Sequence, residues 1–287
     1  MFFLNSAVFK ENFLNHCKWR QEIQSFSTGI QLSNTNFVGK HELKYLAEIR
    51  RLFDVKSGAS HVIRDQAGKS IKSSLIHSWN WCTRDSAVFP TRGNLVKISN
   101  EMAGLGGAEA KFFKSELTLQ NNFTRGIFTL TKTFKIGYAL PFDKTCPVPF
   151  FDRFQMGGPT SLRGFSVNSL GPRQFTDSLG GTCLIESGLQ CSFPIIKSAA
   201  NFARAHLFVN AGLLSDQNIC KTASESIKEG STNPWKVMNP NVSVGGGLMF
   251  KMAESARLEL NFSVPVLTQN GVVPNRGVQV GIGMEFL

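Results

Sequence analysis

The sequence predicts an all-β protein, and more specifically a transmembrane antiparallel β-barrel of roughly twelve strands. Four observations support this prediction. Apolar and polar residues alternate along several long segments, and only 18% of the residues are charged. The mean hydropathy is −0.07, as expected when only every second residue of a strand faces lipid. Phenylalanine and glycine occur in 25 and 26 copies, which suits a lipid-facing surface and crowded strands.

Alternation begins weakly near residue 96 and becomes clear in two segments, 113–123 and 128–138. In each segment apolar residues alternate with polar or charged ones, as expected for strands with one face in lipid. Between them, Thr124-Arg125-Gly126 predicts a tight turn, because glycine readily takes the positive φ that such turns often need. The two segments are therefore predicted to form neighbouring antiparallel strands.

Weaker alternation near residues 206–209 precedes two strictly alternating segments, 256–264 and 277–286. The polar positions of the first are Arg257, Glu259, Asn261 and Ser263. A soluble β-sandwich also alternates, but its strands are usually about five or six residues long. The predicted strands are mostly longer, at about ten residues, which is near the length that crosses a bilayer at a tilt. Strand length therefore favours the membrane barrel.

A connection of about forty residues, roughly 141–180, separates two predicted strands and is far longer than a hairpin turn. Connections of this length usually have a function. Residues 151–173 of this connection read FDRFQMGGPTSLRGFSVNSLGPR and place an arginine between small and aromatic residues. An ordinary glycine-rich surface loop is the alternative interpretation. The motif residues are Gly157, Gly158, Leu162, Arg163, Gly164, Phe165, Gly171 and Pro172.

This string, with its glycine and proline flanks, resembles the inward-folded loop of the BamA-like outer-membrane barrel-assembly superfamily. It is most similar to the mitochondrial branch, the core barrel subunits of the sorting and assembly machinery (SAM complex). The resemblance implies that the loop folds into the lumen, where Arg163 contacts acidic or polar groups, Gly164 allows close approach and Phe165 packs beneath. A buried arginine needs a partner because desolvating its charge is costly. Glu186 and Asn210, on the next two strands, are the candidate partners.

The end of the chain resembles the β-signal of such barrels, a polar residue followed by glycine and two hydrophobic residues. The matching residues are Gln279, Gly281, Met284 and Phe286. The pattern is short and degenerate, but its place at the end of the chain makes it more specific.

The resemblance covers the chain from about residue 20 to its end. It implies assembly and insertion of β-barrel precursor proteins into the mitochondrial outer membrane, by strand addition at the seam between first and last strands. The implied partners are precursor clients, other SAM subunits such as metaxin-like proteins, and membrane lipids. The alternatives are a passive or protein-translocating pore of the same superfamily, or an inactive fragment.

One departure from the family pattern concerns the N-terminal side. Family members have a polypeptide-transport-associated domain followed by a sixteen-strand barrel. Residues 1–287 are instead expected to form a single bacterial-surface-antigen-type barrel domain, the C-terminal part of such a barrel. That soluble domain and about four first strands are expected to be missing. Either the barrel closes in a different way, or the chain is a fragment, because lipid cannot satisfy an open strand edge.

Other function classes are not expected. The five histidines include no HExxH motif, no serine lies in GxSxG, and the six cysteines form no CxxC, so no enzyme, metal site or cofactor is predicted. The net charge of +11 is dispersed without a basic run of five, which argues against nucleic-acid binding and suits a barrel lumen or anionic lipid. The N-terminus resembles neither a secretory signal nor an Arg-rich presequence, in keeping with an outer-membrane barrel targeted by internal signals.

Overall fold

The structure, a computed structural model, describes residues 2–12, 19–33, 39–143, 146–174, 177–196, 201–216, 239–253, 256–269, 271–272 and 274–283. No helix among these residues is both long and apolar enough to cross a membrane.

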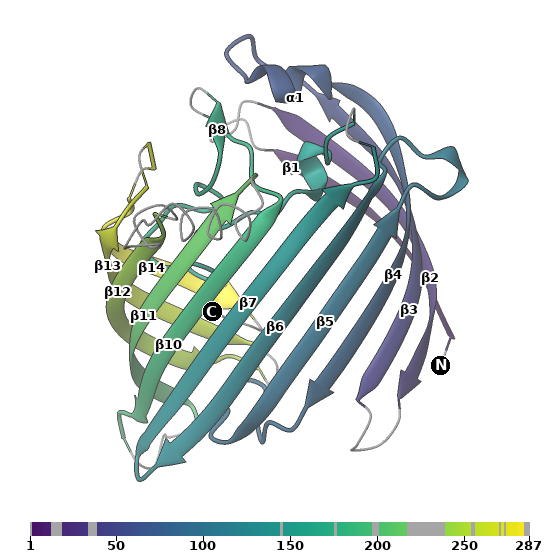
Figure 1. The fold of residues 1–287 in the computed structure, drawn as a ribbon. Helices are drawn as coiled ribbons and strands as arrows, with labels where there is room; N and C mark the ends of the chain where they lie inside the picture. The colour runs from purple at the N-terminus through teal and green to yellow at the C-terminus, as the bar shows by residue number, and fades with distance from the viewer. Residues whose placement is uncertain are drawn as a thin grey trace, which may run out of the picture.

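Twelve antiparallel strands form one strongly curved sheet (Figure 1). Sequence neighbours are also neighbours in the sheet, whose order begins at β1 and ends at β14. Within the described residues no pairing joins these two end strands, so the sheet is open. The strands are β1 (Phe2–Asn12), β2 (Arg20–Ser33), β3 (Lys40–Phe53), β4 (Gly68–Cys82), β5 (Gly93–Ala103), β6 (Phe112–Arg125), β7 (Phe128–Pro141), β10 (Cys183–Pro194), β11 (Ala203–Ser215), β12 (Asn241–Lys251), β13 (Arg257–Leu267) and β14 (Gly277–Gly283).

These strands confirm the predicted all-β class and the expected strand number. The predicted turn also forms, since Arg125 of β6 pairs with Phe128 of β7 and Gly126 has a φ of 64°. The two strictly alternating segments become β13 and β14, which pair along the register that joins Glu259 to Gly281.

The two faces of the sheet differ in polarity as a membrane barrel requires. On β13, Glu259 and Asn261 are 0% exposed on the inner face, whereas Phe262 is 58% exposed on the outer face. On β14, Gln279 is 6% exposed and Val278 is 72% exposed. A soluble sandwich would bury its apolar face instead. The polar inside and apolar outside therefore exclude the sandwich and are typical of transmembrane barrels.

The described residues of the long connection 142–182 pack against the inner face of the sheet. It contains the short helix η2 (Phe150–Asp152) and a two-stranded ribbon of β8 (Arg173–Gln174) and β9 (Asp177–Ser178). Its buried apolar side chains join inward-facing residues of several strands in one core, which includes Phe112, Met156, Leu162, Phe165, Leu170, Leu184 and Leu214.

A second apolar cluster joins the same connection to the first strands. Phe150 and Leu179 pack with Trp19, Leu52 and Ile63. Ile63 belongs to helix α1 (His61–Asp65), which lies between β3 and β4. The connection, called the inner loop below, therefore contacts strands from both halves of the sheet.

Candidate functional site: the inner loop and Arg163

Glycine at position 164 lets the inner loop reach the wall of the sheet. Gly164 has a φ of 87°, and a Cβ atom there would lie 3.1 Å from the Cβ of Ser243 and 3.6 Å from that of Ser263. Both serines are fully buried, on β12 and β13. Any other residue would be strained in this backbone conformation and would crowd the wall. The backbone at Gly164 therefore lies close to the wall formed by β12 and β13.

Arg163, next to this glycine, is fully buried and forms an ion pair with Glu259 of β13. Its Nε and Nη2 atoms donate to Glu259 Oε2 at 3.1 and 2.8 Å. Both side chains are 0% exposed. The guanidinium also lies 4.7 Å from the ring centre of Phe208, a cation–π distance. The arginine of the loop is thus bound by charge, hydrogen bonds and an aromatic face.

Neutral groups complete the surroundings of Arg163. With the Asn210 amide oriented so that both its polar atoms are satisfied, its oxygen accepts from Arg163 Nη1 at 3.1 Å. Gln190 Oε1 lies 3.5 Å from Nη2, a longer contact. Of the two partners proposed from the sequence, Asn210 therefore lies at Arg163 in the structure.

For the other proposed partner, Glu186, the structure shows a different contact. Its carboxylate accepts a hydrogen bond from Ser161 Oγ at 2.5 Å instead. The acid at Arg163 comes from β13, a strand further along the sheet than the two considered. Glu259 could have been noticed as the one acid on the polar face of the strictly alternating segment 256–264.

Glu259 is shared between two arginines. Its Oε1 atom lies 2.7 Å from Nη2 of Arg257, while its Oε2 atom also accepts from Asn261 Nδ2 at 2.8 Å. Asn261 in turn lies 2.6 Å from the ring Nε2 of His206. Burying this carboxylate requires such partners, because an isolated buried charge costs several kcal/mol.

The C-terminal motif meets the inner loop at Gln279. The backbone N–H of Gly164 donates to Gln279 Oε1 at 2.8 Å, and Gln279 Nε2 donates to the carbonyl of Phe165 at 2.9 Å. The side chain of the last described strand therefore satisfies two backbone groups of the Arg-Gly-Phe segment. The loop motif and the C-terminal motif, whose residues Gly164 and Gln279 are 115 positions apart in the sequence, form one site.

The remaining motif residues have packing roles or lie outside the described residues. Leu162 and Phe165 are 0% exposed in the core of the loop. Gly158 faces Val167 and Gly171 faces Leu214. Gly157 has a φ of 110°, Pro172 accepts from the amide of Leu179 at 2.9 Å, and Gly281 pairs with Glu259 in the ladder. Met284 and Phe286 lie outside the described residues.

The polar groups of this site attach the inner loop to the sheet. Charged and amide groups hold one loop segment against β12, β13 and β14, and no three His, Cys, Asp or Glu side chains in the described part of the chain are grouped to bind a metal ion. The arrangement fixes the loop relative to the last strands of the sheet.

Comparison with known proteins agrees with this architecture. Residues 10–286 match the family model described as the Omp85 superfamily domain. The chain is 36% identical over 256 residues to a human protein named "Sorting and assembly machinery component 50 homolog", and 35% identical over 259 residues to a SAM50-like protein of Schizosaccharomyces pombe. These alignments cover 86% and 87% of this chain and 52% of each relative. The chain thus spans about half the length of the curated relatives it matches.

Solved structures show the same fold at low sequence identity. The crystal structure of BamA from Haemophilus ducreyi matches with a TM-score of 0.77 at 15% identity, over 98% of this chain and 59% of that one. CdiB from Acinetobacter baumannii matches with a TM-score of 0.57 at 13% identity, over 99% of this chain and 47% of the other.

Proposed function

The chain belongs to the Omp85 superfamily, and from this premise we propose that it assembles β-barrel precursor proteins and inserts them into a membrane. The observation that carries the proposal is the identity of 36% over 86% of this chain to a human protein named as a sorting and assembly machinery component. The proposed role is that of an assembly factor rather than an enzyme. We also propose the mitochondrial outer membrane as the location of this barrel protein, on the basis of its identity to relatives named as sorting and assembly machinery components.

The geometry suggests how such an activity works. β14 stands at the end of the sheet order and pairs with β13. Lipid cannot hydrogen-bond to a strand edge, where each unmet backbone group costs several kcal/mol. A precursor strand that adds to this edge would satisfy those groups, which is strand addition as in other β-augmentation complexes. The edge of β14 is therefore the proposed site of client pairing.

The inner loop supports this edge from inside the sheet. Arg163 binds Glu259 on β13, and Gln279 of β14 binds the backbone on either side of the Gly164–Phe165 peptide. These contacts hold the last two strands in place while the edge of β14 exchanges partners. The loop motif and the last strand are thus proposed to act as one unit.

The proposed partners follow from the same premise. Barrel precursors are the clients, and other sorting-and-assembly subunits, metaxin-like proteins among them, are the proposed companions. Membrane lipids contact the apolar outer face, on which Val278, Val280 and Ile282 of β14 are all more than half exposed.

Depletion of the native protein tests the proposal. We expect newly imported barrel precursors to stall before assembly, and cysteines placed along β14 to cross-link to the last strand of a stalled precursor. Normal levels of mitochondrial barrels after depletion would contradict the proposal. Conductance of the purified protein, combined with such normal levels, would instead support the pore alternative.

A further inference from the structure

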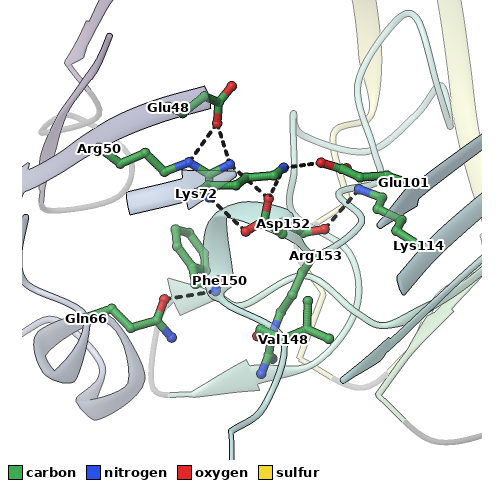
Figure 2. A network of polar contacts seen from close by, with 10 residues as sticks. All are labelled: Glu48, Arg50, Gln66, Lys72, Glu101, Lys114, Val148, Phe150, Asp152 and Arg153. Atoms are coloured by element: carbon green, nitrogen blue, oxygen red, sulfur yellow. Dashed lines mark hydrogen bonds and ion pairs between the residues drawn. The ribbon is translucent and has the colours of Figure 1, made fainter. Parts of the chain in front are cut away.

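Asp152, eleven residues before Arg163 in the chain, is a buried acid of the inner loop that the site above does not use. It ends helix η2 and is 4% exposed. Figure 2 shows it at the centre of a network of charged side chains that come from the strands β3 to β6. An acid this deeply buried is stable only with charged or hydrogen-bonding partners.

Two cations of the wall occupy both oxygens of the Asp152 carboxylate. Arg50 of β3 donates from Nη1 to Oδ2 at 2.7 Å and from Nη2 to Oδ1 at 2.9 Å, a bidentate pair (Figure 2). Lys72 of β4 donates to Oδ1 at 2.7 Å. Bidentate arginine–carboxylate pairs fix direction as well as distance. The carboxylate is therefore held in one orientation against two neighbouring strands.

The backbone and the neighbouring aromatic residues of the loop contact a third cation, Lys114, and one of the first two, Arg50. Lys114 of β6 donates to the carbonyl of Asp152 at 2.9 Å and lies 4.3 Å from the ring centre of Phe154. Arg50 lies 5.7 Å from the ring centre of Phe151. The whole segment Phe151–Phe154 is thus attached to the first strands, with Asp152 at its centre.

The wall also has acids of its own. Arg50 pairs with Glu48 at 2.6 Å, and Lys72 pairs with Glu101 at 2.6 Å. The cluster of Glu48, Arg50, Lys72, Glu101, Lys114 and Asp152 therefore contains three acids and three bases. Asp152 is the acid of this cluster that belongs to the loop. Without its charge, Arg50 and Lys72 would still be paired inside the wall.

We propose that Asp152 is a positioning residue that forms a second anchor of the inner loop, which thereby acts as a brace across the lumen. The Asp152 anchor attaches the first part of the loop to β3, β4 and β6, while the Arg163 anchor attaches the later part to β13 and β14. Of these strands, β3 and β4 lie on the opposite side of the curved sheet from β13 and β14, and β6 lies near its middle (Figure 1). The brace fixes the separation of the two ends of the open sheet.

This inference deepens the proposed function and rests on it for one step, the use of the brace in client assembly. If the separation of the sheet ends controls access to the edge of β14, then loss of the Asp152 anchor slows precursor assembly. The attachment of the loop at Asp152 can be measured without any client.

Hydrogen exchange of the native protein in lipid nanodiscs tests the anchor directly. Asp152→Asn removes the charge of the loop, and Glu48→Gln is the matched control because it changes a partner of Arg50 that lies outside the loop. We expect Asp152→Asn to speed exchange of the amides of Phe150 and Phe154 at least about tenfold. Glu48→Gln should change their exchange less than about threefold, because Arg50 keeps its bidentate pair with Asp152.

Asp152→Glu keeps the charge and should restore slow exchange together with normal precursor assembly, which a general packing defect would not show. Unchanged exchange in folded Asp152→Asn would overturn the inference. If Asp152→Asn does not insert into the membrane, Lys114→Met removes the bond to the Asp152 carbonyl and should speed exchange about threefold; no change there would also overturn it.

The two hypotheses fail in different ways. Fast exchange in Asp152→Asn supports the anchor even when depletion of the protein leaves barrel assembly normal, a result that contradicts the proposed function alone. Slow exchange in Asp152→Asn overturns the anchor even when depletion stops barrel assembly.

Discussion

The two anchors of the inner loop have opposite charge arrangements. At the later anchor the loop supplies a cation, Arg163, and the wall supplies one carboxylate, Glu259, which Arg257 shares. At the earlier anchor the loop supplies an anion, Asp152, and the wall supplies cations that have their own acids. The later anchor therefore depends on the carboxylate of Glu259, whereas at the earlier anchor the charge is shared among several acids and bases. This difference ranks the effects expected from substitutions.

The largest effect is expected for Glu259→Gln. The substitution removes the carboxylate charge that the fully buried Arg163 and the partly buried Arg257 share, and breaking a buried pair in this way costs about 3–5 kcal/mol. Urea unfolding of the protein in micelles should show a midpoint lowered accordingly. The matched control is Glu116→Gln, whose partly exposed pair with Lys135 is worth about 0–1 kcal/mol. Equal midpoints for the two variants would contradict the special position of Glu259.

Arg163→Met should cost less than Glu259→Gln, although it removes the arginine of the motif. Glu259 then keeps its pair with Arg257, and the apolar replacement faces Phe208. The expected loss is about 2–3 kcal/mol in the same unfolding measurement. A larger loss than that of Glu259→Gln would show that the acid is not the centre of the anchor.

Asp152→Asn should destabilise the fold still less, by about 1–2 kcal/mol, because Arg50 and Lys72 keep Glu48 and Glu101. The two anchors attach to different strands, β3 and β4 for Asp152 and β13 for Arg163, so the double variant with Arg163→Met should lose the sum of the single losses to within about 0.5 kcal/mol. A markedly non-additive result would mean that the loop binds as one rigid unit rather than through two independent anchors.

The smallest effect concerns pH. Burial disfavours the charged form of Asp152, but hydrogen bonds and charges from Arg50 and Lys72 outweigh it and lower the pKa of this carboxyl below 3.8. A lowered folded-state pKa means that the stabilisation is complete above the unfolded pKa of about 3.9 and is lost as the pH falls through the folded value. Fluorescence of Trp19, which packs edge-on against Phe150 at 5.1 Å, should therefore change only in strong acid. In Asp152→Asn that part of the transition should be absent.

Much of the fold could be predicted from the sequence because its causes are local. Strict alternation gave both the position and the facing of β13, and the glycine at 126 gave the turn between β6 and β7. The role of Gly164 could be anticipated from the motif that contains it. These features depend on a few neighbouring residues and on the period of a strand.

The partners of the loop could not be predicted in the same way. Arg163 and Glu259 are separated by 96 positions, and Asp152 and Arg50 by 102. Which inward side chains meet depends on the register of every hairpin between them and on the curvature of the sheet. Asp152 also lies among aromatic residues of an irregular loop, where no periodic pattern distinguishes a buried acid from an exposed one.

The most direct measurement is import of a radiolabelled barrel precursor into mitochondria that carry the native protein, Arg163→Met, Asp152→Asn or the control Glu116→Gln at equal levels. We expect precursor assembly to slow several-fold in both anchor variants and to proceed normally in the control, because both anchors hold the loop that braces the last strands and the Glu116–Lys135 pair belongs to neither anchor. Equal assembly rates in all four, together with a displaced loop in the anchor variants, would contradict the claim that the braced loop serves client assembly.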